Sequence, residues 1–182
     1  MKILKGYQNR LPKIWFYNIN GSKHLSTPNE IQIASLMSKK KASIFLESRF
    51  YIRQSLSEIF NLNPLKIPIE AHPGVAPKLP QDMGYISISH CNDAFAIAWH
   101  HQKIGIDIER NDRKFNYKAL AKKYFRVDNI SNKVINYDRK FVLKEWCELE
   151  AAIKWDNGKL AKDIRNWKYI NGANYLTHKT KK

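Results

Sequence analysis

The sequence is poor in acidic residues and in cysteine, and it contains no long apolar run. Its 182 residues include only 16 Asp and Glu against 32 Lys and Arg, which gives a net charge of +16. An excess of this size predicts an anionic partner: a nucleic acid, a membrane surface, a polyanionic small molecule or an acidic protein. A lysine-rich proteome with a solvated basic surface would give the same composition, so charge alone does not choose among them.

Cysteine occurs only as Cys91 and Cys147, too few for the disulfide framework of a small secreted domain. The first residues, MKILK, are followed by polar ones and do not form the pattern of a signal peptide. The longest strongly apolar stretch runs for about six residues, from Ala94 to Trp99, which is too short to span a bilayer. We therefore expect a soluble cytoplasmic protein with free thiols.

The first half of the chain contains patterns of both strands and helices. Residues 14–19 are rich in β-formers and predict a strand, and Thr27 with Glu30 forms a candidate capping box at the start of a helix. A second helix is predicted over residues 42–60, and the proline-rich stretch 64–80 is expected to be extended or loop. The apolar positions at helical spacing in the second helix are Phe45, Ile52, Leu56 and Ile59.

The second half begins with alternating sequences. Residues 85–90, 94–99 and 104–109 predict three strands of an antiparallel meander. The pattern is then helical and basic as far as Trp155, and a hairpin is expected around Asn171-Gly172. With 43% hydrophobic residues the chain can bury a core, so the expected fold class is α+β, as one domain or two small halves.

Two carboxylates lie two residues apart on the predicted strand 104–109. Asp107 and Glu109 would project from one face of that strand, since side chains alternate across it. Neighbouring carboxylates repel each other unless a cation lies between them, and hard oxygen ligands suit Mg²⁺. The alternative is a half-exposed strand whose charged face meets only solvent.

A predicted helix in the second half carries a second candidate pair. Glu150 and Lys154 are one turn apart at the edge of an apolar stripe, where they could meet Asp107. The alternative is an ordinary surface ion pair. Glu145 and Glu148 are expected to be solvated. The stripe consists of Val142, Trp146, Leu149 and Ile153.

Ser89 and His90 end the predicted strand 85–90, a common position for phosphate contacts. A Ser–His nucleophile pair is disfavoured, because adjacent strand residues point to opposite faces. The adjacent His100 and His101 are expected to be in solvent, and no cysteine pattern supports a zinc site.

Taken in order and spacing, three segments resemble the signatures of the phosphopantetheinyl transferase superfamily, and the monomeric, two-half (Sfp-like) branch fits best by length. They are residues 86–90 (ISISH), residues 104–109 (IGIDIE) and the pattern Trp146-x-x-x-Glu150-Ala151-x-x-Lys154. The resemblance implies two similar α+β halves, 1–100 and 101–182, related by a pseudo-twofold. Each half would be a small antiparallel sheet packed with helices, the second one truncated.

The resemblance also implies a reaction and its residues. The 4′-phosphopantetheine group of coenzyme A would move to a serine of an acidic acyl or peptidyl carrier protein, with release of 3′,5′-ADP. Asp107, Glu109 and Glu150 would hold Mg²⁺ or Mn²⁺, directly or through water, and Lys154 would contact the phosphates and help 3′,5′-ADP to leave. Our own hypothesis for the base is Glu150 or a water that it holds. A monomer would be self-sufficient. The residues implied for coenzyme A binding are Ser89, His90, Arg49, Arg53 and one of Lys39, Lys40 or Lys41.

The chain departs from the family pattern at two places. Leu149 stands where relatives usually carry a lysine before the catalytic glutamate, and only 28 residues follow Lys154. An inactive or impaired protein of the same fold is therefore one alternative. A basic nucleic-acid-binding module is the other, supported by aromatic residues among Lys and Arg. These aromatics are Trp15, Phe16, Tyr17, Tyr124 and Phe125.

Overall fold

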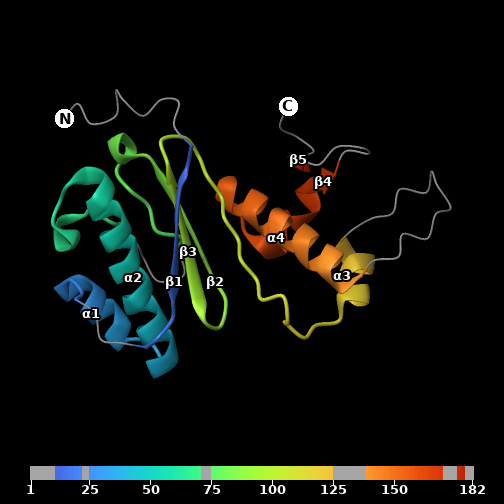
Figure 1. Ribbon diagram of the computed structural model, residues 1–182, viewed down its shortest axis with the longest axis horizontal. Coiled ribbons are helices and arrows are strands. Elements are labelled where there is room, and N and C mark those ends of the chain that lie inside the picture. Colours follow the sequence, from blue (N-terminus) through green and yellow to red (C-terminus); the bar gives the residue numbers. More distant parts are fainter. Residues whose placement is uncertain (1–10, 22–24, 71–74, 125–137, 170–175, 179–182) are drawn as a thin grey trace. The chain divides into compact units, whose positions relative to one another are not determined.

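The computed structural model describes residues 11–21, 25–70, 75–124, 138–169 and 176–178, and it divides the chain into two compact units, Met1–Ile104 and Gly105–Lys182 (Figure 1). The sequence-based boundary, between residues 100 and 101, lies close to this division. Each unit is described by itself below. Both combine helices with antiparallel strands, so the fold class is α+β.

The first unit is built on a three-stranded antiparallel sheet. Strands β1 (Lys13–Asn18), β2 (Tyr85–His90) and β3 (Ala94–His100) have the spatial order β1-β3-β2, with β3 paired on both sides. The three strands lie within one residue of the predicted bounds at each end. A short turn, residues 91–93, joins β2 to β3, so the first two strands of the predicted meander pair as expected.

Two helices cover one side of this sheet (Figure 1). Helix α1 (Pro28–Ser35) begins with the predicted capping box: Thr27 N donates to Glu30 Oε2 at 2.8 Å, and Glu30 N donates to Thr27 Oγ1 at 3.3 Å. Helix α2 (Lys39–Phe60) begins three residues earlier than predicted and ends where expected. Short 3₁₀ turns, η1 (Pro64–Lys66) and η2 (Gln81–Met83), punctuate the proline-rich stretch.

The core of the first unit lies between α2 and the sheet. Side chains alternate between the two faces of a strand, and this decides which residues of β2 enter the core. Ile86 and Ile88 pack against the core, whereas the side chains of Ser87 and Ser89 lie on the other face of the sheet. The large buried residues are Tyr51, Ile52, Leu56, Phe60, Phe95, Ile97 and Trp99.

The second unit is organised around helix α4 (Arg139–Trp155), whose N-cap is Asp138. Helix α3 (Tyr117–Tyr124), the short α5 (Leu160–Asp163) and the 3₁₀ turn η3 (Ile164–Asn166) contact α4. The paired strands β4 (Trp167–Tyr169) and β5 (Leu176–His178) do so as well. The turn expected at Asn171-Gly172 lies outside the described residues. The predicted stripe of α4 is confirmed, because Val142, Trp146, Leu149 and Ile153 are all buried.

The strand predicted over residues 104–109 is wrong. Residues 103–110 have no regular secondary structure and belong to neither sheet. Alternation in sequence identifies an extended segment, but a strand also needs a hydrogen-bonded neighbour. Here Gly105 packs against the backbone of helix α4 instead.

Within the described residues, no helix combines the length and the apolar character needed to cross a membrane.

Candidate active site

The central contact of the second unit joins segment 103–110 to helix α4. Lys154 Nζ donates to Asp107 Oδ1 at 2.6 Å, across 47 residues of sequence. The Asp107 side chain is only 3% exposed, whereas that of Lys154 is 30% exposed. The carboxylate is therefore held inside the unit, and the ammonium reaches it from the rim.

Gly105 allows this approach. A β-carbon at this position would collide with the carbonyl oxygen of Ala151 and lie 2.7 Å from the backbone nitrogen of Trp155. Only glycine permits the segment to touch the last turns of α4 so closely. The contact fixes Asp107, two residues further on, beside the helix face that carries Glu150 and Lys154.

Glu150 lies in the electrostatic reach of Asp107. Burial raises the pKa of Glu150, and the negative charge of Asp107 raises it further. Lys154, a hydrogen bond with Trp146 and the charge of Arg113 act in the opposite direction. The charges of two of the predicted metal ligands, Asp107 and Glu150, therefore interact.

Cys147 of helix α4 lies close to Asp107. Burial raises the pKa of its thiol to about 12, and the charge of Asp107 and a hydrogen bond to that carboxylate add to the effect. The sequence reasoning assigned Cys147 no place in the site. Its spacing, three residues before Glu150 and seven before Lys154, was the signal that could have found it.

Glu109 is held differently from Asp107. It forms an ion pair with Arg113, four residues further along the chain, and the Glu109 side chain is 17% exposed. Both carboxylates of the segment therefore have a cation of the chain itself as a partner. Arg113 was not among the predicted site residues, although its position four residues after Glu109 suggested the pair.

The other two glutamates of α4 differ from each other. Glu148 pairs with Lys144 at 3.2 Å on the exposed side, in agreement with a solvated position. The prediction that Glu145 is solvated is wrong, because Glu145 is only 8% exposed. Its spacing from Val142 and Leu149 places it on the buried face of the helix.

The donor set of Asp107 and Glu150 fits a hard divalent cation. These two carboxylates supply oxygen ligands of the kind that Mg²⁺ binds, and their mutual repulsion favours a nearby cation. Across the described part of the chain, however, no three His, Cys, Asp or Glu side chains gather as a metal site would require. Glu109, the third predicted ligand, is the one engaged by Arg113.

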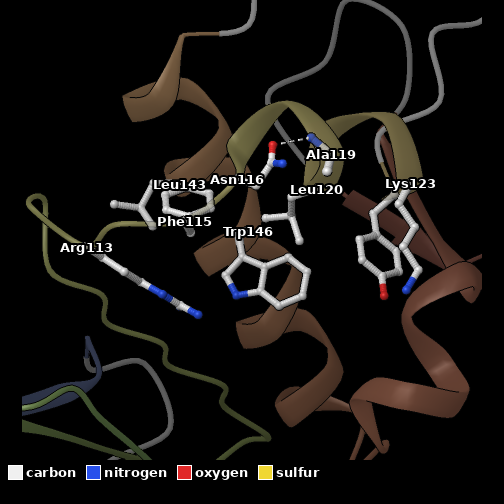
Figure 2. Close-up of a pocket in the computed structure, with 9 residues that line it drawn as sticks. Arg113, Phe115, Asn116, Ala119, Leu120, Lys123, Leu143 and Trp146 are labelled. Atoms are coloured by element: carbon white, nitrogen blue, oxygen red, sulfur yellow. Dashed lines mark hydrogen bonds between the residues drawn. The ribbon is translucent and has the colours of Figure 1, made fainter.

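A cavity of about 340 Å³ lies between α3, α4 and the segment that precedes α3 (Figure 2). Trp146 lies in the centre of the view, with Arg113 and Lys123 on opposite sides of it. Arg113 lines the cavity and pairs with Glu109, and Trp146 lines it and forms a hydrogen bond with Glu150, so the cavity adjoins these two carboxylates. Its remaining lining is mostly apolar: Phe115, Asn116, Ala119, Leu120, Tyr124 and Leu143.

Leu149, the position at which the resembled family usually carries a lysine, is a core residue. It is 3% exposed and packs in a cluster with Trp146, Ile153 and Ile164. The leucine therefore adds apolar packing to α4. The contact between Lys154 and Asp107 is formed with leucine at this position.

Ser89 and His90 belong to the first unit. The register places Ser89 opposite Ala96 and His90 opposite Phe95, so the two side chains lie on different faces of the sheet. This agrees with the argument against a Ser–His nucleophile pair. Ser89 is 6% exposed, whereas His90 is exposed and its ring meets Phe95 edge-on at 5.8 Å between centroids.

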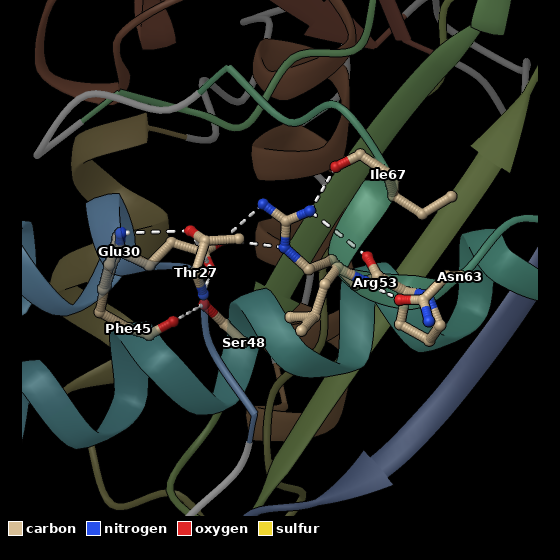
Figure 3. Close-up of polar contacts among 9 residues, drawn as sticks. Thr27, Glu30, Phe45, Ser48, Arg53, Asn63 and Ile67 are labelled. Carbon is tan, nitrogen blue, oxygen red and sulfur yellow. Dashed lines mark hydrogen bonds and ion pairs between the residues drawn. The ribbon is translucent and has the colours of Figure 1, made fainter.

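Arg53 is bound within the first unit (Figure 3). Its Nε and Nη2 donate to Glu30 Oε1 at 3.0 and 2.9 Å, and its Nη1 donates to the carbonyl oxygen of Ile67. The side chains of Arg53 and Glu30 are 6% and 7% exposed. Arg53 thus joins α2 to α1 and to the loop after η1, and these contacts occupy the guanidinium that was predicted to bind a nucleotide.

Arg49, one turn earlier, has a different environment. It is 5% exposed, stacks over Phe45 at 4.7 Å, and its buried Nε has no hydrogen-bond partner among the residues that the structure describes. Burial lowers the pKa of Arg49 to about 10, and the charge of Arg53 contributes in the same direction. This buried cation is the stronger of the two arginine candidates for an anion.

Comparison with models of known protein families gives no match for this chain, and comparison with curated proteins gives none either.

Proposed function

We propose that this chain is a phosphopantetheinyl transferase, which moves the 4′-phosphopantetheine group of coenzyme A to a serine of an acidic acyl or peptidyl carrier protein. The observation that carries the proposal is the meeting of Asp107, Glu150 and Lys154. These residues come from two of the three signature-like segments, and the 2.6 Å contact between Lys154 and Asp107 joins the two segments. An accidental likeness of two short motifs would not require them to meet.

In the proposed reaction, the serine hydroxyl of the carrier attacks the β-phosphorus of coenzyme A. A new P–O bond forms to the serine oxygen, and the bond between the β-phosphorus and the bridging oxygen breaks, so that 3′,5′-ADP leaves with the bonding electron pair. Glu150 suits the role of base, because burial and Asp107 raise its pKa toward the range where a carboxylate takes a proton effectively. Lys154 balances charge on the phosphates.

Asp107 and Glu150 would hold the Mg²⁺ or Mn²⁺ ion, with Glu109 as a further ligand. When bound, the ion neutralises charge that develops on the diphosphate oxygens. Asp107 is the main anchor, because its carboxylate is almost fully buried and is fixed by the contact of Gly105 with α4.

The cavity beside Glu150 fits an uncharged, flexible arm. Its lining of aromatic and aliphatic residues offers apolar contact, and Arg113 and Lys123 supply cations at its margin. We assign the pantetheine arm to this cavity. An apolar pocket with a few polar groups is the usual environment of such a ligand.

The first unit supplies the candidates for the nucleotide. Lys39, Lys40 and Lys41 are exposed in the first turn of α2, where cations oppose the helix dipole and an anion would be favoured. Arg49, His90 and Ser89 are further candidates. Arg53 has weaker support, because Glu30 and the carbonyl oxygen of Ile67 already occupy its guanidinium. The net charge of +16 would speed the capture of an acidic carrier.

The remaining parts of the proposal follow the family resemblance. The enzyme would act as a cytoplasmic monomer. The impaired-transferase alternative is favoured by one observation, the ion pair of Glu109 with Arg113. The nucleic-acid alternative has less support, because Trp15 and Tyr17 pack against the first core.

The test is a transfer assay read by intact mass. The full chain is incubated with coenzyme A, Mg²⁺ and a set of apo-carrier proteins, with EDTA as the control. The proposal expects one carrier to gain a single phosphopantetheine group only when Mg²⁺ is present. Binding of coenzyme A without transfer to any carrier would favour the impaired transferase, and tight RNA binding with no transfer would favour the nucleic-acid module.

A further inference from the structure

Two ion pairs of the second unit are linked electrostatically to Glu150. Lys154 contacts Asp107, Arg113 contacts Glu109, and both cations act on Glu150. If all five groups are ionised, the cluster keeps one uncompensated negative charge. A cluster of this kind attracts an additional cation, yet each carboxylate of segment 103–110 already has a partner from the chain.

The two cations differ from their partners in exposure. The Lys154 side chain is 30% exposed and the Asp107 side chain 3%, and the values for Arg113 and Glu109 are 45% and 17%. In each pair the cation lies nearer to solvent than the carboxylate. Both cations also belong to long side chains, which reach solvent by simple rotation.

We propose that Lys154 and Arg113 are exchangeable counter-ions. They hold the carboxylates of Asp107 and Glu109 in the metal-free protein and are released when a divalent cation binds there. The inference rests on the proposed function, because it takes the metal site from that proposal. In the metal-free protein the cations of the chain itself neutralise the buried carboxylates, and the divalent cation then replaces them, so that these carboxylates have a positive partner in both states.

The exchange couples the metal to the anionic substrate. The released ammonium of Lys154 and guanidinium of Arg113 become available to a phosphate, and Arg113 already lines the adjoining cavity. Metal binding therefore raises the affinity for the anion, and by thermodynamic linkage the anion raises the affinity for the metal to the same extent.

The experiment measures Mn²⁺ binding alone, by electron paramagnetic resonance of the free ion, without coenzyme A or carrier. Lys154→Gln and Arg113→Gln each remove one competing cation, and each is expected to bind Mn²⁺ about tenfold more tightly than the wild type. Lys144→Gln is the matched control, because it removes the same charge from an exposed pair with Glu148 on the same helix. Its affinity is expected to change by less than about twofold.

Circular dichroism checks that each variant is folded, and Arg113→Gln remains informative if Lys154→Gln does not fold. Unchanged or weaker Mn²⁺ binding in the folded variants overturns the exchange. The outcome is separate from that of the transfer assay: tighter binding in the variants with no transfer by the wild type contradicts the proposed reaction and keeps the exchange. No Mn²⁺ binding by any of these proteins contradicts both.

Discussion

Lys154 and Asp107 form a 2.6 Å ion pair that joins the end of helix α4 to the segment that precedes helix α3. The aspartate is buried and the lysine is partly open to solvent. Such a pair adds little net stability when it is intact, but loss of one partner leaves a buried charge uncompensated. The geometry of the site therefore depends on the presence of both residues.

Lys154→Gln is expected to lower the free energy of unfolding of the second unit by about 3 kcal/mol, because Asp107 would remain charged and buried. Asp107→Asn combined with Lys154→Gln is expected to recover most of this loss, since neither charge remains. Urea unfolding followed by tryptophan fluorescence measures both. A double variant as unstable as Lys154→Gln alone would contradict the assignment of the loss to the uncompensated charge of Asp107.

Gly105→Ala is expected to displace segment 103–110, because a methyl group at this position collides with the backbone of Ala151 and Trp155. Transfer and Mn²⁺ binding should both fall by more than tenfold. Gly21→Asn is the control: nothing lies within 4 Å of that position, and its φ of 66° suits asparagine. A Gly105→Ala protein with normal Mn²⁺ affinity would contradict the role of this contact.

Substitutions of Arg53 and Arg49 are expected to have different effects, the first on stability and the second on coenzyme A binding. Arg53→Met leaves Glu30 buried without its main partner, and a loss of about 3–5 kcal/mol is expected. Arg49→Met removes a cation whose burial already lowers its pKa, so the fold should tolerate it, while affinity for coenzyme A falls. Thermal unfolding and calorimetric titration with coenzyme A make the comparison. The reverse order of the two effects would contradict this assignment.

Cys147 should react slowly with iodoacetamide in the native protein. The thiolate is the reactive form, and a pKa raised from 9.0 to about 12 reduces its fraction at pH 8 on the order of a thousandfold. Peptide mass spectrometry after timed alkylation, in buffer and in urea, gives the ratio of the two rates. A native rate equal to the rate in urea would show that the thiol does not lie in this buried, negatively charged environment.

Much of the fold was predictable because the signals are local. The capping box of Thr27 and Glu30 needs only three residues of spacing. The alternation of Ile86 and Ile88 with serines assigns the two faces of β2. The apolar stripe of α4 identifies its buried face in the same way.

The errors concern partners that are distant in sequence. Residues 104–109 alternate as a strand does, but their neighbour is the backbone of α4 and not another strand. Arg49 and Arg53 look alike in sequence, and only the position of Glu30, on another helix, distinguishes them. Glu145 was the avoidable error, since its spacing from Val142 and Leu149 already placed it on the buried face.

The candidate site was predictable in part for the same reason. Glu150 and Lys154 share a helix edge, so their proximity follows from spacing. The meeting of Lys154 with Asp107 needed the three signature-like segments to be interpreted together. The ion pair of Glu109 with Arg113 was missed, because Glu109 was considered only as a metal ligand and no cation was sought among the residues after it.

The most direct test of the central claim is the joint measurement of carrier mass and 3′,5′-ADP released, with wild-type chain and with Asp107→Asn. The account predicts that the wild type releases one 3′,5′-ADP for each carrier that gains a phosphopantetheine group. It also predicts that Asp107→Asn, checked as folded, does neither. A carrier set that stays unmodified while coenzyme A remains intact, or an Asp107→Asn protein that transfers at the wild-type rate, would contradict it.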